Sequence, residues 1–310
     1  MNTSLPRTFI ERMTHTYGSA GAQWCAALPG HLAQLALQWD LVLGDPFPLT
    51  MNYVCRAMHR THRTPLVLKT GFPAEEFAAE LAMYDQYRGR TGVQCIAIDH
   101  AQYAVVLEHI NPGTRLDDAG MSDQQQAHVI AGLIRDSVFP HDRGVDLPSI
   151  DTIVNDIRPH ARMICAQRPE LFSLEHIERA CHIMTTSTTR TKWYPLHGDL
   201  HAGNVLLRDR RYVHIDPQGL IGPMVYECTP FIRDRHKSVA HTQGGNLRTG
   251  ALQQVFADAL DIPVVVVAQW CYATAVCSAW WSFQSTQSIE PADYRAVDDF
   301  WTLLQMHNAM

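Results

Sequence analysis

Three oxygen-bearing side chains occur close together in the second half of the chain. In the string HGDLHAGNV, Asp199 is followed five positions later by Asn204, and Asp216 comes shortly afterwards. Residues 205–207 and 212–215 are rich in branched or aromatic side chains and flank a basic turn, which predicts a β-hairpin that gathers the three side chains. Proteins bind Mg²⁺ through one or two carboxylates plus substrate phosphates, so Asn204 and Asp216 are chemically sufficient ligands for it.

The spacing of Asp199 and Asn204 matches the D-x-x-x-x-N element of kinase catalytic loops. There the aspartate accepts the proton of the substrate hydroxyl, the asparagine coordinates a metal ion, and a later aspartate completes the metal site. A lone Asp–Asn pair at this spacing is more often a solvated loop or a helix cap. The complete string favours a kinase-type site, because His197 and two glycines are in register, Asp216 follows and Lys69 ends an upstream strand.

The elements that must position these residues change in character along the chain. The first 38 residues have helical patterning, which Pro29-Gly30 is expected to interrupt. Short β-branched segments then predict strands, with one helix that begins after Pro73 and ends at Gly89. The strands are expected at 39–43, 52–58, 65–69, 94–99 and 102–107.

From Asn111 onward the periodicity is mainly helical. Helices are expected at 122–138, 150–166, 174–184 and from 250 onward. A β-rich part followed by a mainly helical part predicts the α+β class. The predicted division is an N-terminal nucleotide-binding lobe with a helical extension at 1–107, a hinge at 108–114 and a C-terminal catalytic and substrate lobe at 115–310.

The composition excludes several classes of protein. Apolar residues make up 46% of the chain and charged residues 18%, which is typical of a globular protein and not of a disordered one. There are 25 Lys and Arg against 31 Asp and Glu, a net charge of −6, without a basic block. Nucleic acid is therefore not an expected partner, since its phosphate backbone requires a basic surface.

One long apolar segment has to be weighed as a membrane span. Charged residues are absent between Asp261 and Glu290, and 262–283 is long enough to cross a bilayer. Its flanks are acidic and lack the basic cluster that usually marks the cytoplasmic end of an anchored helix. A buried core helix is the preferred interpretation, and a membrane is not an expected partner.

The cysteines and the first residues of the chain indicate a cytoplasmic protein. Eight cysteines are scattered without a C-x-x-C pair, so disulfides are not expected. Arg7, Glu11 and Arg12 interrupt the stretch in which a signal peptide would need apolar residues. Export is therefore not indicated.

The strings around the hairpin resemble one known family. HGDLHAGNVLL with IDPQG downstream is similar to the aminoglycoside phosphotransferase family of small-molecule kinases. IDPQGLIGPMVYECTPFIRD, PLVLKTG and AEEFAAELAMYDQYRG most resemble its streptomycin and hydroxyurea kinase branch, over about Trp39 to Asp234. The resemblance implies a protein-kinase-like two-lobed fold with ATP and Mg²⁺ as cofactors. It also implies phosphorylation of a hydroxyl on a small polar molecule, foremost an aminoglycoside such as streptomycin, and hence a role in antibiotic resistance.

The same resemblance implies roles for individual residues. Asp199 would orient and deprotonate the acceptor hydroxyl, and Asn204 and Asp216 would hold Mg²⁺. His197 would pack beneath their loop. Lys69 would bind the α- and β-phosphates of the nucleotide.

Further nucleotide contacts are expected in the N-terminal lobe and the hinge. Glu76 and Glu80 share a helix face, and Glu80 is the preferred partner of Lys69 because AAEL aligns better with the family's helix. Glu108 and Ile110 lie where the chain would pass between the lobes, and the backbone there would pair with adenine.

The loop expected to cover the phosphates is the poorest match to the family. Residues 44–52, GDPFPLTMN, contain one glycine and two prolines, and proline has no backbone N–H to donate. Thr50 and Asn52 are the candidates for additional contacts. The string G-x-x-x-x-G-K-[ST] does not occur, which excludes a P-loop NTPase.

Alternatives remain open for the site and for the acceptor. His197, Asp199 and His201 alternate and could bind a transition metal in a hydrolase, although this leaves Asn204 and Lys69 without roles. A kinase fold that only binds ligands would be expected to have lost a catalytic residue. The acceptor could be a cationic aminoglycoside or an unrelated metabolite, because acceptor pockets vary within one fold. The acidic residues that could attract a cation are Asp234, Glu290 and Asp293.

Overall fold

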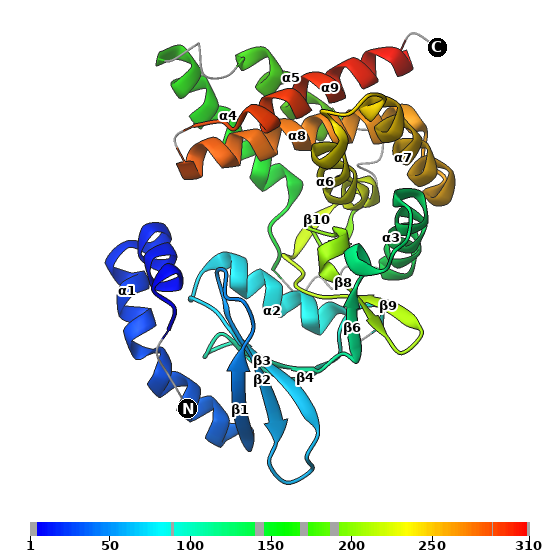
Figure 1. Ribbon diagram of the computed structural model, residues 1–310. Coiled ribbons are helices and arrows are strands. Elements are labelled where there is room, and N and C mark those ends of the chain that lie inside the picture. The colour runs from blue at the N-terminus through cyan, green and yellow to red at the C-terminus, as the bar shows by residue number, and fades with distance from the viewer. Residues whose placement is uncertain are drawn as a thin grey trace. The chain divides into compact units, whose positions relative to one another are not determined.

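The computed structural model describes residues 5–87, 90–139, 146–167, 173–186, 192–286 and 288–308 of the 310-residue chain. The chain forms two compact units, Met1–Gly113 and Thr114–Met310 (Figure 1). The first unit is built on a β-sheet and the second is mainly helical, in agreement with the β-rich and helical parts predicted from the sequence.

The first unit contains a five-stranded antiparallel sheet in the order β1-β2-β3-β5-β4. The strands are β1 Leu41–Pro46, β2 Tyr53–His59, β3 Pro65–Thr70, β4 Cys95–Asp99 and β5 Ala104–Glu108, and helix α2, Glu75–Tyr87, follows β3. Their branched and aromatic side chains suit a pleated, half-buried surface. In β3, Lys69 lies opposite Val54 on one side and Val105 on the other. The lysine is therefore held near the end of a strand that is paired on both edges.

Helix α1, Arg7–Gln38, consists of two arms separated by a bend, and the end of its second arm leads towards β1 (Figure 1). The bend is at Gly18, whose φ of 61° and ψ of −143° lie outside the helical region. Glycine adopts this conformation easily because it has no Cβ. Pro29 stays inside the second arm, so the predicted interruption at Pro29-Gly30 is wrong.

Apolar side chains of α1 share one core with the sheet. Phe9, Met13 and Leu35 are almost completely buried and belong to the same cluster as Cys55 of β2 and Leu68 of β3. Burying a side chain of this size contributes about 1.5–3 kcal/mol. The helix is thus a structural part of the first unit.

The chain after β5 forms short strands and helices. These elements are β6 Pro112–Arg115, η1 Leu116–Asp118, α3 Asp123–Ser137, α4 Ile150–Gln167, α5 Leu174–Thr186, β7 Tyr194–Leu196, η3 Ala202–Asn204, β8 Val205–Arg208, β9 Arg211–His214, β10 Leu220–Gly222, η4 Met224–Cys228, α6 Thr229–Val239, α7 Gly245–Leu260, α8 Val264–Thr286 and α9 Pro291–Asn308. Strands β8 and β9 form the predicted hairpin, in which Val205 pairs with His214. Strand β7 pairs with β10.

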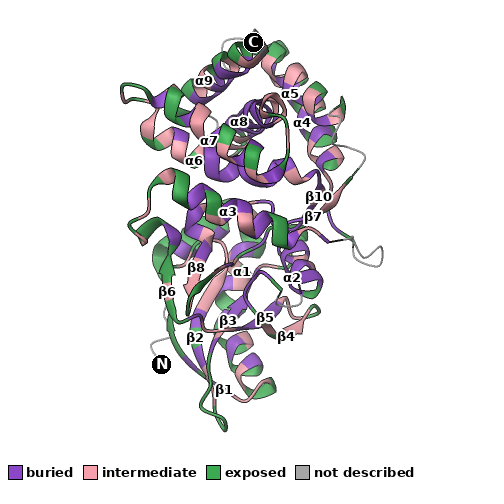
Figure 2. Cartoon of the chain, turned by 90° about the vertical axis from the view of Figure 1, so that its right-hand side faces the viewer, coloured by how far each residue is buried: buried purple, intermediate pink, exposed green. Residues whose placement is uncertain are grey.

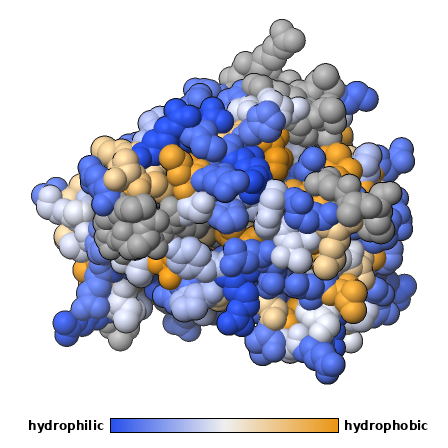
Figure 3. All heavy atoms as spheres, turned by 90° about the horizontal axis from the view of Figure 1, so that it is seen from above, coloured by the Kyte–Doolittle hydropathy of each residue, from blue (hydrophilic) through white to orange (hydrophobic). Residues whose placement is uncertain are grey.

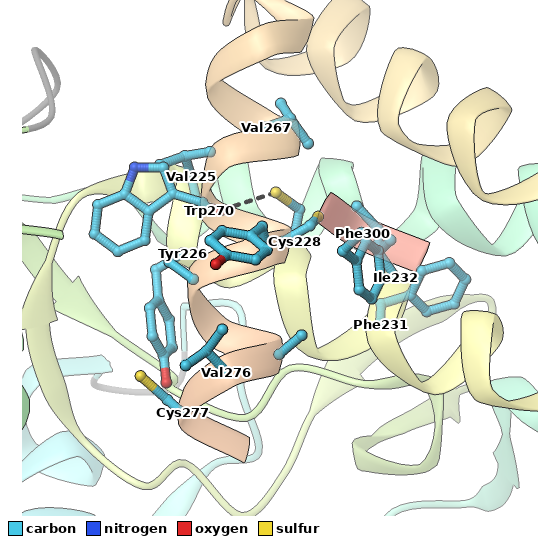
Figure 4. Packing of buried hydrophobic residues seen from close by; sticks show 14 of the residues in the cluster. Val225, Tyr226, Cys228, Phe231, Ile232, Val267, Trp270, Val276, Cys277 and Phe300 are labelled. Carbon is cyan, nitrogen blue, oxygen red and sulfur yellow. Dashed lines mark hydrogen bonds between the residues drawn. The ribbon is translucent and has the colours of Figure 1, made fainter. Parts of the chain in front are cut away.

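Helix α8 forms much of the core of the second unit. Over Val264–Gln284 it is long and apolar enough to cross a membrane, but 67% of its apolar window is buried inside the protein. Trp270 and Trp280 of this helix are fully buried. Figure 2 shows α8 among the other helices of the unit, and Figure 4 shows Trp270 beside Tyr226 and Cys228. This packing is that of a core helix, the interpretation preferred from the sequence.

Apolar side chains on the surface are dispersed. Figure 3 shows hydrophobic residues scattered among hydrophilic ones over the face in view. The large exposed apolar side chains Leu37, Met163 and Leu247 belong to three different helices. Single exposed apolar residues of this kind are normal and do not mark a binding site. All eight cysteines are free, and seven of them are buried.

Candidate active site

In the first unit, Lys69 of β3 forms an ion pair with Glu80 of α2. Both side chains are buried, and the Tyr84 hydroxyl donates a 2.8 Å hydrogen bond to Oε1 of Glu80. Glu76, the other candidate partner, is exposed one turn earlier. A buried charge is costly unless it has a partner of opposite sign, so the Lys69 ammonium group is expected to stay beside the Glu80 carboxylate. Glu80 therefore fixes the position of the ammonium group.

The two residues expected beside adenine lie at the end of the same sheet. Glu108 is the last residue of β5; its backbone N–H donates to the Gln94 carbonyl at 3.0 Å, and its Oε1 accepts from the Gln94 N–H at 2.8 Å. Ile110 is buried two positions later. Because the Glu108 N–H is engaged within the sheet, a contact of this residue's backbone with adenine would have to use its carbonyl oxygen.

In the second unit, His197 joins the segments that carry the predicted catalytic residues. Its Nε2 lies 2.8 Å from the Ile215 carbonyl, so this nitrogen carries the proton. Its Nδ1 then accepts a 3.3 Å hydrogen bond from the Asp199 N–H. The His197 carbonyl accepts from the Gln218 N–H at 2.7 Å. The buried, neutral imidazole therefore supports the loop from beneath.

Asn204 and Asp216 are placed by the same network. The Nδ2 of Asn204 donates to the Asp199 carbonyl at 3.1 Å, and the Asn204 carbonyl accepts from the Ile215 N–H at 2.9 Å. Asp216 follows directly in a left-handed conformation with a φ of 56°, which aspartate tolerates better than most residues. The structure thus places Asp199, Asn204 and Asp216 on adjoining segments. Since Asn204 uses its Nδ2 within the loop, its Oδ1 is the atom that could bind a cation.

Comparison with known proteins identifies the family. Residues 51–285 match the model of the aminoglycoside/hydroxyurea antibiotic resistance kinases. The chain belongs to this family. The kinase is a phosphotransferase that acts on a hydroxyl group of a small molecule, and the resemblance read from the sequence is confirmed.

Relatives of the kinase are similar over much of its length. Streptomycin 6-kinase of Streptomyces glaucescens is 24% identical over 301 residues, which are 93% of this chain and 94% of the relative. Hydroxyurea phosphotransferase of Kitasatospora aureofaciens is 27% identical over 233 residues, 73% of this chain and 67% of the relative. A solved ternary complex of a thermostable mutant of aminoglycoside phosphotransferase APH(4)-Ia with ADP and hygromycin B has a TM-score of 0.53 at 11% identity, covering 87% of this chain and 97% of that chain. This likeness confirms the predicted protein-kinase-like α+β fold.

Asp199 of the kinase lies among side chains of both charges. Burial raises the pKa of its carboxyl group; His201 and Arg233 oppose the rise, and the Asp234 and Asp216 carboxylates add to it. Nε2 of His201 is 3.7 Å from Oδ2 of Asp199, and Nη2 of Arg233 is 3.9 Å from Oδ1. A base must be ionised to accept a proton, so these two neighbours favour the form of Asp199 that catalysis needs.

A buried carboxylate that the sequence analysis missed holds the loop of the kinase from the other side. Glu227 in η4 accepts hydrogen bonds from the backbone N–H of His197 and from that of Gly198, the latter at 3.1 Å. Burial raises the pKa of Glu227 to about 7, although the two N–H donors act in the opposite direction. The available signal was an acidic residue inside the apolar string PMVYECTPF, which suggests a buried carboxylate with an internal partner.

Glu227 should make the stability of the kinase depend on pH. Its folded-state pKa of about 7 is above the ordinary value of 4.5, so its contribution is fully present below about pH 4.5 and is lost as the pH rises through about 7. The loss amounts to ~3 kcal/mol. Glu227→Gln stays neutral, and its unfolding free energy in urea should therefore fall less than that of the wild type between about pH 5 and about pH 8.

The exposed Glu290→Gln substitution is the matched control for this measurement. It makes the same chemical change outside the core and should keep the wild-type dependence on pH. Glu227→Gln should also be less stable than the wild type at about pH 5, because an amide oxygen replaces only one of two acceptors. Equal pH slopes for Glu227→Gln and the wild type would show that Glu227 does not titrate between these pH values.

The three acidic residues considered as attractants for a cationic acceptor differ in their surroundings, and Glu290 is exposed. The Asp234 side chain is 45% exposed, and its Oδ2 lies 3.9 Å from Nδ1 of His201, beside Asp199. Asp293 is buried, and its carboxylate binds Lys237 at 2.6 Å. Asp293 is thus buried against its own cation. Asp234 also has a cationic neighbour, since its Oδ1 lies 3.5 Å from Nε of Arg233, but it is exposed and is the acidic candidate near Asp199.

The hydrolase alternative does not agree with this geometry. Both ring nitrogens of His197 contact backbone groups, and Nδ1 of His201 accepts from the Gly203 N–H at 3.1 Å. Within the ranges that the structure describes, no group of three His, Cys, Asp or Glu residues could hold a metal ion. His197, Asp199 and His201 therefore do not form the transition-metal site of a hydrolase.

Proposed function

We propose that the kinase transfers the γ-phosphoryl group of ATP to a hydroxyl of streptomycin or a closely related aminoglycoside. The main support for phosphoryl transfer is that Asp199, Asn204 and Asp216 lie on adjoining segments joined by hydrogen bonds around the β8–β9 hairpin. The streptomycin 6-kinase that is similar over almost the whole of both chains supports the acceptor. The ADP bound in the APH(4)-Ia complex supports ATP as the donor. The exposed carboxylate of Asp234 supports a cationic acceptor, because opposite charge steers a ligand towards its site.

The proposed reaction moves one phosphoryl group and one proton. A bond forms between the acceptor oxygen and the γ-phosphorus while the bond from this phosphorus to the β,γ-bridging oxygen breaks, and ADP leaves. Asp199 holds the hydroxyl and accepts its proton. Lys69, fixed by Glu80, offsets charge on the α- and β-phosphates. The protein contributes mainly alignment and charge neutralisation, the two effects that dominate phosphoryl transfer.

The remaining predicted contacts complete the nucleotide site of the proposal. Oδ1 of Asn204 and the carboxylate of Asp216 suit Mg²⁺, which prefers oxygen ligands and keeps positions for water and phosphate oxygens. When bound, the ion would neutralise phosphate charge. The carbonyl of Glu108 and the backbone of Ile110 would contact adenine.

An acceptor panel tests this proposal. The purified kinase is incubated with Mg²⁺ and ATP labelled at the γ-phosphate, together with streptomycin, other aminoglycosides, hydroxyurea or amino alcohols. We expect label in streptomycin and none in the amino alcohols. Labelling of a different compound alone would contradict the acceptor but leave the chemistry intact. A failure to label any compound, with no binding of Mg·ATP by calorimetry, would contradict the kinase site itself.

Hydroxyurea is the second candidate acceptor. The hydroxyurea phosphotransferase of K. aureofaciens is the relative with the higher identity of the two, although over a shorter part of the chain. Hydroxyurea is small and uncharged, so Asp234 would have no cation to attract. Asp234→Asn should therefore raise the KM for a cationic aminoglycoside and leave the KM for hydroxyurea unchanged.

A further inference from the structure

The loop between β1 and β2 comprises residues 47–52, FPLTMN. Pro48 has no N–H with which to form a hydrogen bond. The N–H of Phe47 is used to close the hairpin, with the Val54 carbonyl at 2.9 Å. Contacts with other parts of the first unit can therefore contribute to the conformation of this loop.

The first arm of α1 supplies such contacts. Nη1 of Arg12 donates a 3.3 Å hydrogen bond to the carbonyl of Leu49, in the middle of the loop. The side chains of Leu49 and Met51 pack against the cluster that contains the buried Phe9 and Met13 of α1. One exposed guanidinium and one apolar surface thus hold the loop against the helix.

The same helix contacts the segment that directly follows Lys69. Nε2 of His31 lies 3.2 Å from the hydroxyl oxygen of Thr70, the next residue along β3. The ring of Tyr17 stacks on that of Phe72, with centroids 4.1 Å apart and an angle of 13° between the planes. Helix α1 therefore touches both the loop and the end of the strand that carries the lysine.

The loop and the strand end also contact each other closely. A Cβ atom at Gly71 would lie 2.6 Å from Oδ1 of Asn52 and 2.6 Å from Cγ of Phe77. These distances are shorter than van der Waals contact, so glycine is needed to let Asn52 of the loop lie against β3. Loop, strand end and α1 are packed as one body.

We propose that α1 is a positioning element of the nucleotide site, and that Arg12 and the apolar face of the first arm hold residues 47–52 in the conformation that binds the nucleotide phosphates. This inference rests on the proposed function, because it takes these residues to be the phosphate loop. A loop that is fixed before binding loses less conformational entropy when the nucleotide arrives, which increases affinity. Arg12 acts through the loop and is a positioning residue.

The test compares two arginines of the same arm. Arg12→Met removes the hydrogen bond to Leu49, whereas Arg7→Met removes an equal charge that is paired with Glu11 at 2.7 Å and does not reach the loop. The Kd for Mg·ATP, measured by calorimetry without any acceptor, should rise about fivefold in Arg12→Met, or ~1 kcal/mol. It should stay at the wild-type value in Arg7→Met. Arg12→Lys keeps a donor of similar reach and should restore most of the affinity.

Hydrogen exchange supplies a readout that does not depend on the nucleotide. In the unliganded protein, peptides covering 47–53 should exchange faster in Arg12→Met than in Arg7→Met, while peptides covering β3 should exchange at equal rates in both. Equal exchange in 47–53, or equal Kd values for the two variants, would overturn the inference. If the wild type binds no Mg·ATP while the loop exchange still differs, the anchoring by α1 stands and the proposed function fails.

Discussion

Asparagine in place of Asp199 should lower kcat for phosphoryl transfer by about 10²–10⁴-fold, the contribution of a well-placed general base. Asparagine has nearly the size of aspartate but cannot take up the hydroxyl proton. The hydrogen bonds of the Asp199 backbone to the His197 ring and to the Asn204 amide do not involve the carboxylate, so the loop should keep its shape. Transfer to the acceptor found in the panel is the measurement, and the Kd for Mg·ATP should remain close to the wild-type value.

Asp209→Asn is the matched control for this substitution. Asp209 lies at the tip of the β8–β9 hairpin with a φ of 55°, a conformation that asparagine also adopts readily. The same chemical change at this exposed position should leave kcat unaltered. If Asp199→Asn keeps more than about a tenth of the wild-type kcat, Asp199 is not the general base.

The centre of the site could be predicted from the sequence because its residues are neighbours along the chain. Once 205–208 and 211–214 pair as a hairpin, Asn204 and Asp216 have to be close together, whatever the rest of the fold does. Lys69 and Glu80 are separated by 11 positions, and Glu80 is preferred over Glu76 because AAEL matches the family's helix; the structure agrees, since Glu80 is buried beside Lys69 and Glu76 is exposed. The hairpin itself is indicated by local strand and turn signals.

The supports of the site could not be predicted because they come from distant segments. Glu227 binds a backbone 30 positions away, and Arg233 reaches Asp199 from α6. The residue types of Glu227 and Arg233 do not reveal which residues they contact. Those contacts are determined by how distant segments pack together. Helix α8 is an intermediate case: its composition fits a membrane span as well as a core helix, its acidic flanks favour the core helix, and its burial among the other helices of the second unit agrees with that preference.

The bend in α1 shows how two local signals can compete. Proline and glycine at 29–30 are the stronger sequence signal for an interruption, yet the helix continues through them and bends at Gly18. A proline costs a helix about 3 kcal/mol, but the apolar contacts on both sides of Pro29 can offset this, since Cys25, Leu28 and Leu32 are all buried. Burial of these side chains therefore accounts for a helix that continues through Pro29.

Asp216→Asn should lower kcat by about 10³-fold and raise the Mg²⁺ concentration needed for half-maximal rate. Asp216 supplies the carboxylate of the proposed metal pair, and a metal ion that offsets charge on a phosphoryl group is worth several kcal/mol, with a tenfold change in rate for each 1.36 kcal/mol. The rate is measured over a series of Mg²⁺ concentrations. A rate near that of the wild type at every concentration would contradict the assignment of Asp216 as a metal ligand.

Asparagine is the informative substitution at this position because of the backbone. Residue 216 has a φ of 56°, where an ordinary residue with a Cβ costs about 1–2 kcal/mol and asparagine costs less. Asp216→Ala would therefore combine the loss of the carboxylate with a loss of stability in the segment that binds His197 and Asn204 through Ile215. Asp216→Asn should unfold at the wild-type temperature. A lower kcat in Asp216→Asn at an unchanged unfolding temperature would be caused by the missing negative charge. A lower kcat in Asp216→Ala alone would be caused by the change in backbone stability.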